Sequence, residues 1–168
     1  IYTNPDIDAI CYLEGEKVLP NLLEIIERDG VVGNCPGVAF RNEVNEIIDS
    51  PDMPLIEDLN SLPFADFSDF QVDRYFTRQL PVSTSRGCIN RCIFCGESNN
   101  WKRYRFRSAH NIFDEIVHQC NRYPFITSFF FNDSLLNGNL RMLEELCDLI
   151  IKNKINITWG GQAAIRDG

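Results

Sequence analysis

The hydrophobic positions of the C-terminal half change repeatedly between helical and strand-like spacing. Apolar side chains recur every three or four residues in two segments, which predicts amphipathic helices over residues 109–121 and about 140–152. Ser108 and Asn139 precede these segments, and both residue types are good helix N-caps. Short β-prone runs predict strands at residues 81–85, 126–131 and 155–159. Strands that alternate with helices in this way are typical of βαβ units with a parallel sheet.

The N-terminal residues show a shorter version of the same alternation. Residues 8–13 predict a buried strand, and residues 17–28 predict a helix. We expect the apolar face of this helix to hold Leu19, Leu22, Leu23 and Ile26. A second strand is expected at residues 38–40, with residues 46–48 as its hairpin partner.

Residues 49–80 have neither pattern. Prolines recur through the segment and exclude a long helix, while aromatic side chains are frequent. A flexible linker would be rich in glycine and serine instead. We therefore expect an irregular connector that lies on an apolar surface.

The predicted pattern has too few strands to close a barrel. Residues 81–168 are predicted to form three strands and two helices. The first residues of the chain begin in the middle of an alternation of strands and helices. We expect a fragment of a longer protein. A complete three-stranded domain is the competing interpretation.

Composition and charge narrow the class of protein. The chain has 168 residues, 44% hydrophobic and 24% charged, which excludes a disordered or low-complexity protein. It contains no apolar run of membrane-spanning length and no secretion signal, so we expect a cytoplasmic protein without a membrane span. The net charge is −8, with −11 on residues 1–82 and +3 on the remainder. This acidic balance argues against a dedicated nucleic-acid binder.

Three of the seven cysteines, Cys88, Cys92 and Cys95, fall within eight residues. The odd number of cysteines argues against a disulfide framework. Thiolates are soft ligands that suit zinc or an iron–sulfur cluster. Structural zinc usually needs a fourth ligand, for which His110 and Cys120 are candidates only by their proximity in sequence. The remaining cysteines are expected to be core residues: Cys11, Cys35, Cys120 and Cys147.

The Cys-x3-Cys-x2-Cys spacing, with Phe94 just before the third cysteine, resembles the signature of the radical S-adenosylmethionine superfamily. Further stretches resemble the cobalamin-binding branch of that superfamily. In the second half these are Arg105-Phe106-Arg107-Ser108, Phe129 to Ser134 and Asn156 to Gln162. In the first half they are Tyr12 to Glu16, Pro36 to Arg41 and Leu62 to Asp66.

This resemblance implies an α/β fold with three parts. Residues 1–48 would be the C-terminal part of a Rossmann-like cobalamin-binding domain, and residues 49–80 a connector. Residues 81–168 would be the first part of a (β/α) barrel of parallel strands and helices. Because half of the barrel and most of the cobalamin-binding domain would be missing, we expect this fragment alone to be inactive.

The resemblance also implies the cofactors and their ligands. Cys88, Cys92 and Cys95 would bind three irons of a [4Fe-4S] cluster, and S-adenosylmethionine would chelate the fourth. Reductive cleavage would give a 5′-deoxyadenosyl radical, with the electron coming from a flavodoxin or ferredoxin. Candidate contacts to S-adenosylmethionine are Phe94 beside the adenine, Asp133 at the ammonium, and more weakly Gln162 and Arg166. Asp133 could equally be a turn or cap residue.

Two departures from the family pattern matter. The Gly-Gly-Glu run that often follows the second strand is Asn132-Asp133-Ser134 here. The only histidines, His110 and His118, lie outside the upstream region, so we expect cobalamin binding in the full-length protein rather than in this fragment. The typical reaction would be methyl transfer or another radical reaction, on a small-molecule substrate that the sequence does not identify.

Two alternative functions remain open. The chain could be a zinc-binding interaction module, or part of an RNA-modifying methylthiotransferase. The second is prompted by residues 101–107, where basic and aromatic side chains alternate. We favour a solvated edge near the cysteine loop for this stretch, and we expect no nucleic-acid partner.

Overall fold

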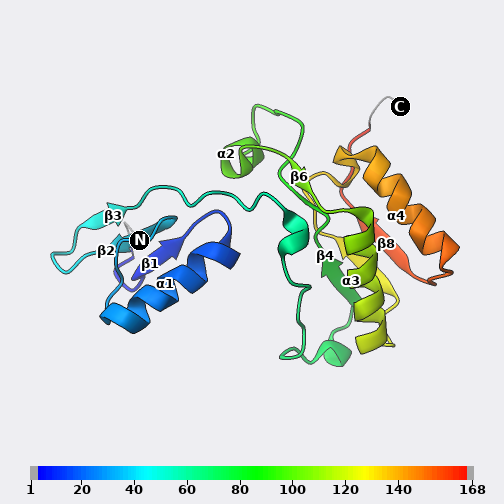
Figure 1. Ribbon diagram of the computed structural model, residues 1–168, viewed down its shortest axis with the longest axis horizontal. Coiled ribbons are helices and arrows are strands. Elements are labelled where there is room, and N and C mark those ends of the chain that lie inside the picture. Colours follow the sequence, from blue (N-terminus) through cyan, green and yellow to red (C-terminus); the bar gives the residue numbers. More distant parts are fainter. Residues whose placement is uncertain (1–3, 166–168) are drawn as a thin grey trace. The chain divides into compact units, whose positions relative to one another are not determined.

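A computed structural model describes residues 4–165, with the side chains of Ser98 and Asn99 excepted. The chain divides into two compact units, Ile1–Ile56 and Glu57–Gly168. They are called unit 1 and unit 2 here, and Figure 1 colours them from blue to cyan and from cyan to red. The connector expected at residues 49–80 is therefore shared between the units rather than separate from both. Within the described residues, no helix has the length and apolar character needed to cross a membrane.

Unit 1 is a three-stranded sheet with one helix packed on it. Its elements are β1 (Ala9–Cys11), α1 (Gly15–Asp29), β2 (Val38–Arg41) and β3 (Ile47–Asp49). The strands lie in the order β1-β2-β3, and both pairs are antiparallel. The helix and the hairpin expected from the sequence are confirmed. The parallel pairing of a Rossmann-like sheet is not found among these three strands.

The core of unit 1 is small because one helix covers one short sheet. Val18 and Leu22 of α1 are buried against Val38 and Phe40 of β2, and Cys35 is buried with them as expected. The apolar face predicted for this helix was partly wrong, since Leu19 and Leu23 are 48% and 50% exposed. Val18 and Leu22 are one helical turn apart, so the helix turns these two residues to the sheet and the two leucines outward.

Unit 2 contains a parallel sheet in the order β4-β7-β8. The helices and strands of this unit are β4 (Gln79–Val82), β5 (Ser85–Arg86), α2 (Glu97–Trp101), β6 (Arg105–Phe106), α3 (Ala109–Arg122), β7 (Ser128–Phe131), α4 (Leu140–Lys152) and β8 (Thr158–Gly161). Short 3₁₀ turns lie at Leu59–Ser61, Val72–Arg74 and Leu136–Gly138. The alternation of strands and helices predicted for this half is confirmed (Figure 1).

Helices α3 and α4 pack on one face of the parallel sheet. Ile112, Ile116 and Leu146 contact the inward side chains of the strands, of which Phe129 and Phe131 are fully buried. Phe130, between them on β7, points to the other face and is 36% exposed. The sheet therefore has one helix-covered face and one open face, as in the wall of a (β/α) barrel.

Both predicted helix caps of unit 2 are present. The Ser108 hydroxyl accepts a hydrogen bond from the Asn111 amide at 3.2 Å, at the start of α3. The Asn139 side chain accepts one from the Met142 amide at 3.1 Å, at the start of α4. Each cap satisfies an amide that has no partner within its helix, so both boundaries are set locally.

The segment before β4 packs along α3. The Ala65 carbonyl accepts a hydrogen bond from Gln119 at 2.7 Å, and the Phe64 ring lies 5.8 Å from that of His118. Phe67 contacts the unit 2 core. The expected apolar packing is found here, but it does not extend to all the aromatic residues, because Phe70, Tyr75 and Phe76 are more than half exposed.

Candidate functional site

Parallel pairing brings the carboxyl ends of β4, β7 and β8 to one edge of the sheet. The segments that follow β7 and β8 are joined there by hydrogen bonds. The Leu136 amide donates to the Gln162 carbonyl at 2.8 Å. The Asn137 side chain donates to the Ala164 carbonyl at 2.8 Å and accepts from the Ala164 amide at 3.1 Å. These contacts hold the segment after β8 beside the segment after β7.

The cysteine loop extends from the third segment at this edge, the one after β4. Its base is closed by β5 and β6, which pair antiparallel and leave residues 87–104 between them. Gly87 has a φ of +83°, and a Cβ there would lie 2.7 Å from the Arg103 carbonyl oxygen. Only glycine fits this close approach without displacing the backbone.

Two arginines of the Arg-x-Arg-Ser stretch are buried below this loop. Arg107 forms an ion pair with Glu115 of α3 and donates to the Ser83 carbonyl at 2.8 Å. Arg105 is 6% exposed, with its guanidinium 5.9 Å from the centre of the Trp101 ring. The expectation of a solvated edge was wrong at these two positions. Pairing with a carboxylate eight residues away cannot be read from the alternation of basic and aromatic residues.

The three clustered cysteines line a single open cavity of about 270 Å³, together with Phe94 and Gln162. All three are free thiols, with Cys92 exposed and the other two partly buried. The Cys95 amide donates to the Cys92 carbonyl at 3.0 Å, which forms a turn between these two cysteines. The three thiols therefore share a cavity, and their binding of one metal centre stays a prediction.

The residues around this cavity bear on the choice between an iron–sulfur cluster and a zinc ion. Within residues 4–165, no group of three Cys, His, Asp or Glu side chains is close enough to hold one metal ion. Neither proposed fourth zinc ligand lines the cavity. The His110 Nδ1 atom lies 3.3 Å from Oε1 of Glu145. Cys120 packs against the core, and burial there raises the pKa of its thiol.

The other predicted contacts lie in different surroundings. Phe94 is 89% exposed at the cavity, and Gln162 is exposed there after β8. Asp133 is only 4% exposed and does not line the cavity. Burial raises the pKa of its carboxyl group, although hydrogen bonds from Ser85 and Thr84 act in the opposite direction. Arg166 lies outside the described residues.

Sequence reasoning missed two polar residues of the cavity. Glu97 and Ser134 both line it, and the Ser134 hydroxyl donates a hydrogen bond to the Glu97 carboxylate. Glu97 follows the third cysteine by two residues, and Ser134 follows β7 beside Asp133. Their positions next to the recognised motifs were the available signal.

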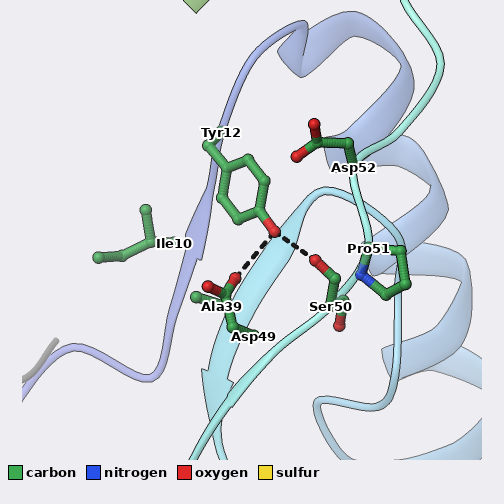
Figure 2. A pocket seen from close by; sticks show the side chains of 7 residues that line it. All are labelled: Ile10, Tyr12, Ala39, Asp49, Ser50, Pro51 and Asp52. Atoms are coloured by element: carbon green, nitrogen blue, oxygen red, sulfur yellow. Dashed lines mark hydrogen bonds between the residues drawn. The ribbon is translucent and has the colours of Figure 1, made fainter. Parts of the chain in front are cut away.

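Unit 1 has a separate open cavity of about 670 Å³ on its sheet (Figure 2). The Tyr12 hydroxyl points to the Asp49 carboxylate at 2.9 Å and to the Ser50 carbonyl. Burial, followed by the hydrogen bond and negative charge of Asp49 and the charge of Asp52, raises the pKa of Tyr12 to about 12. These groups make an anionic pocket in unit 1 that the sequence did not predict.

Similar proteins include two enzymes. The chain is 29% identical over 166 residues to anaerobic magnesium-protoporphyrin IX monomethyl ester cyclase of Synechocystis, covering 97% of this chain and 33% of that protein. It is 23% identical to cytidylyl-2-hydroxyethylphosphonate methyltransferase of Streptomyces wedmorensis, covering 85% and 33%. The chain thus spans about a third of the length of these relatives. No family model matches the sequence.

Two solved structures share the fold. Cobalamin-dependent S-adenosylmethionine radical enzyme OxsB, with aqua-cobalamin and S-adenosylmethionine bound, matches with a TM-score of 0.70 at 20% identity, over 90% of this chain and 22% of that one. The radical S-adenosylmethionine methyltransferase TsrM of Kitasatospora setae, with cobalamin and a [4Fe-4S] cluster bound, has a TM-score of 0.62 at 20% identity, over 88% and 30%. The chain is therefore similar in sequence to a cyclase and a methyltransferase, and it shares its fold with two cobalamin-dependent S-adenosylmethionine radical enzymes.

Proposed function

We propose that this chain forms the cluster-binding part of a radical S-adenosylmethionine enzyme, in which Cys88, Cys92 and Cys95 hold a [4Fe-4S] cluster. The observation that supports this most directly is the single cavity lined by all three free thiols. Its place at the carboxyl edge of a parallel sheet is where active sites of (β/α) barrels are built. Three thiolates leave one iron of the cluster without a protein ligand, which is the position available to S-adenosylmethionine.

When bound, the cluster would supply the electron that cleaves the sulfonium of S-adenosylmethionine to methionine and a 5′-deoxyadenosyl radical. The protein's own residues bind and orient the ligand. Phe94, exposed at the cavity, offers an apolar surface to the adenine. The Gln162 amide and the Glu97–Ser134 pair are the polar groups of the same cavity, and we assign them to the amino-acid portion of the ligand.

The reaction that follows radical formation is proposed to be methyl transfer or a related radical reaction. The names of the relatives, a methyltransferase and a cyclase, favour this class without identifying the substrate. Both solved neighbours were determined with cobalamin bound. Unit 1 has no histidine to ligate cobalt, and we propose that cobalamin is bound by the full-length protein rather than by this fragment. The electron would come from a flavodoxin or ferredoxin.

The proposal is tested by replacing one thiolate ligand. The full chain and its Cys92→Ala variant would be reconstituted anaerobically with iron and sulfide, and iron content and the visible spectrum measured. We expect about four irons per chain in the parent protein and loss of the cluster in the variant, because a methyl group cannot ligate iron.

Cys147→Ala is the matched control, since Cys147 lies in α4 and does not line the cavity. It should retain the iron. Equal iron in the parent and Cys92→Ala, or a colourless protein that holds zinc, would contradict the proposal. The RNA-modifying alternative has less support, because Arg105 and Arg107 of its basic stretch are buried.

A further inference from the structure

Asp133 is the most enclosed acidic group at the carboxyl edge of the parallel sheet. It follows β7 by two residues and is 4% exposed. Its Oδ1 atom accepts hydrogen bonds from the Thr84 amide at 3.0 Å, from the Ser85 amide, and from the Ser85 hydroxyl at 2.8 Å. One carboxylate oxygen thus satisfies three donors on two consecutive residues.

Those donors lie at the junction from which the cysteine loop starts. Thr84 lies between β4 and β5, Ser85 is the first residue of β5, and both are buried. The Thr84 carbonyl also accepts a hydrogen bond from the Arg107 amide at 2.8 Å, at the other end of the loop. The junction is therefore held from two sides. Asp133 accepts hydrogen bonds from the backbone amides of Thr84 and Ser85, and the backbone amide of Arg107 donates to the Thr84 carbonyl.

Asp133 is also separated from the cavity of the three cysteines. Its neighbour Ser134 lines that cavity, whereas Asp133 does not. Hydrogen bonds to a charged acceptor are stronger than those between neutral groups, and a buried donor without a partner is costly. The three bonds within the protein are therefore a physical reason for a hydrogen-bond acceptor at this position, whereas the second oxygen, Oδ2, is buried without a hydrogen-bond partner in the described part of the chain.

We propose that Asp133 is a positioning residue: its carboxylate fixes the Thr84–Ser85 junction, and thereby the start of the cysteine loop, and does not contact S-adenosylmethionine. This differs from the role at the ammonium group that the family resemblance suggests. The statement about the loop rests on the geometry of the junction. The consequence for the cluster rests on the proposed function.

The test compares two substitutions at this position in the full chain. Asp133→Ala removes all three hydrogen bonds, whereas Asp133→Asn keeps a carbonyl oxygen that can accept them. Amide hydrogen exchange at Thr84 and Ser85 is measured before reconstitution, and iron content and S-adenosylmethionine affinity afterwards. We expect exchange about tenfold faster in Asp133→Ala, with iron reduced to roughly half or less. Asp133→Asn should keep exchange within about twofold, with iron content and affinity retained.

Two further variants separate a local effect from general unfolding. Ser85→Ala removes only the hydroxyl donor and leaves both backbone bonds, so exchange should rise by about threefold. Asn132→Ala alters the exposed neighbour of Asp133 and should leave exchange at the junction unchanged.

The outcomes that overturn the proposal differ from those that overturn the proposed function. A tenfold loss of S-adenosylmethionine affinity in Asp133→Asn, with exchange and iron unchanged, would show a direct contact instead. Unchanged exchange in Asp133→Ala would exclude the positioning role. If the parent chain takes up no iron, the proposed function fails, and the exchange measurements still decide whether Asp133 fixes the junction.

Discussion

The two units are built from similar parts but pair their strands in opposite ways. Each has a three-stranded sheet with helix packed on it, antiparallel in unit 1 and parallel in unit 2. Parallel strands place all their carboxyl ends at one edge, whereas antiparallel strands alternate. In unit 2, segments that follow β4, β7 and β8 therefore meet at the cysteine cavity. The polar pocket of unit 1 instead lies across its sheet, around Tyr12 and Asp49.

In unit 2 the residues that support the fold are different from those that line the cavity, whereas in unit 1 they overlap. In unit 2 the core faces the helices, and the candidate ligands lie on loops beyond the strand ends. The loops can therefore vary while the sheet stays the same. In unit 1, Tyr12 and Asp49 belong to or adjoin the strands themselves, so the pocket and the sheet depend on the same residues.

The largest loss of stability is expected when a buried side chain is removed from the helix-covered face of the sheet in unit 2. Phe129→Ala removes a fully buried ring, which typically costs about 3–5 kcal/mol of unfolding free energy. Urea unfolding can be followed by tryptophan fluorescence, because both tryptophans, Trp101 and Trp159, belong to unit 2. Phe130→Ala is the control on the same strand. The Phe130 residue is 36% exposed, so its replacement should lower the unfolding free energy clearly less than Phe129→Ala does. Equal losses in the two variants would mean that both faces of the sheet are packed alike.

An intermediate effect is expected at the turn before β2 in unit 1. Gly37 has a φ of +79°, and a Cβ there would lie 2.8 Å from Val18 Cγ2. Gly37→Ala should therefore destabilise unit 1 by more than about 1 kcal/mol, through both backbone strain and overlap with the core. Gly15→Ala is the control, since nothing lies within 4 Å of its Cβ position at the start of α1. Faster amide exchange at Phe40 in Gly15→Ala than in Gly37→Ala would contradict this account.

The features that sequence predicted correctly were those specified by near neighbours. The apolar periods of α3 and α4, and their caps Ser108 and Asn139, depend on residues within a few positions. The cysteine cluster was recognisable because its spacing places three thiols on one short loop. These signals do not require knowledge of how distant segments meet.

The features that sequence missed depend on contacts between distant segments. The burial of Arg107 depends on Glu115 and Ser83, and the enclosure of Asp133 depends on Thr84 and Ser85. The antiparallel pairing of β1 with β2 was equally inaccessible, because a three-residue strand has the same pattern in parallel and antiparallel pairs. Glu97 lines the cavity because of the way its loop folds, and it belongs to no motif that the sequence analysis recognised.

The smallest effect concerns the pocket of unit 1 at high pH. Burial and Asp49 raise the pKa of Tyr12 from an ordinary value of 10.0 to about 12, so the folded state favours the neutral phenol. The contribution of this group to stability is complete below about pH 10 and is lost as the pH rises towards about 12. Burial also raises the pKa of Tyr104, so titration followed by tyrosinate absorbance should show late ionisation of both tyrosines, and Tyr12→Phe should remove the step that belongs to Tyr12. Tyr75→Phe, in an exposed segment of unit 2, should leave that step in place. If Tyr12 ionises near pH 10, its hydroxyl is not held by Asp49, and the strand-based pocket that distinguishes unit 1 is not formed in solution.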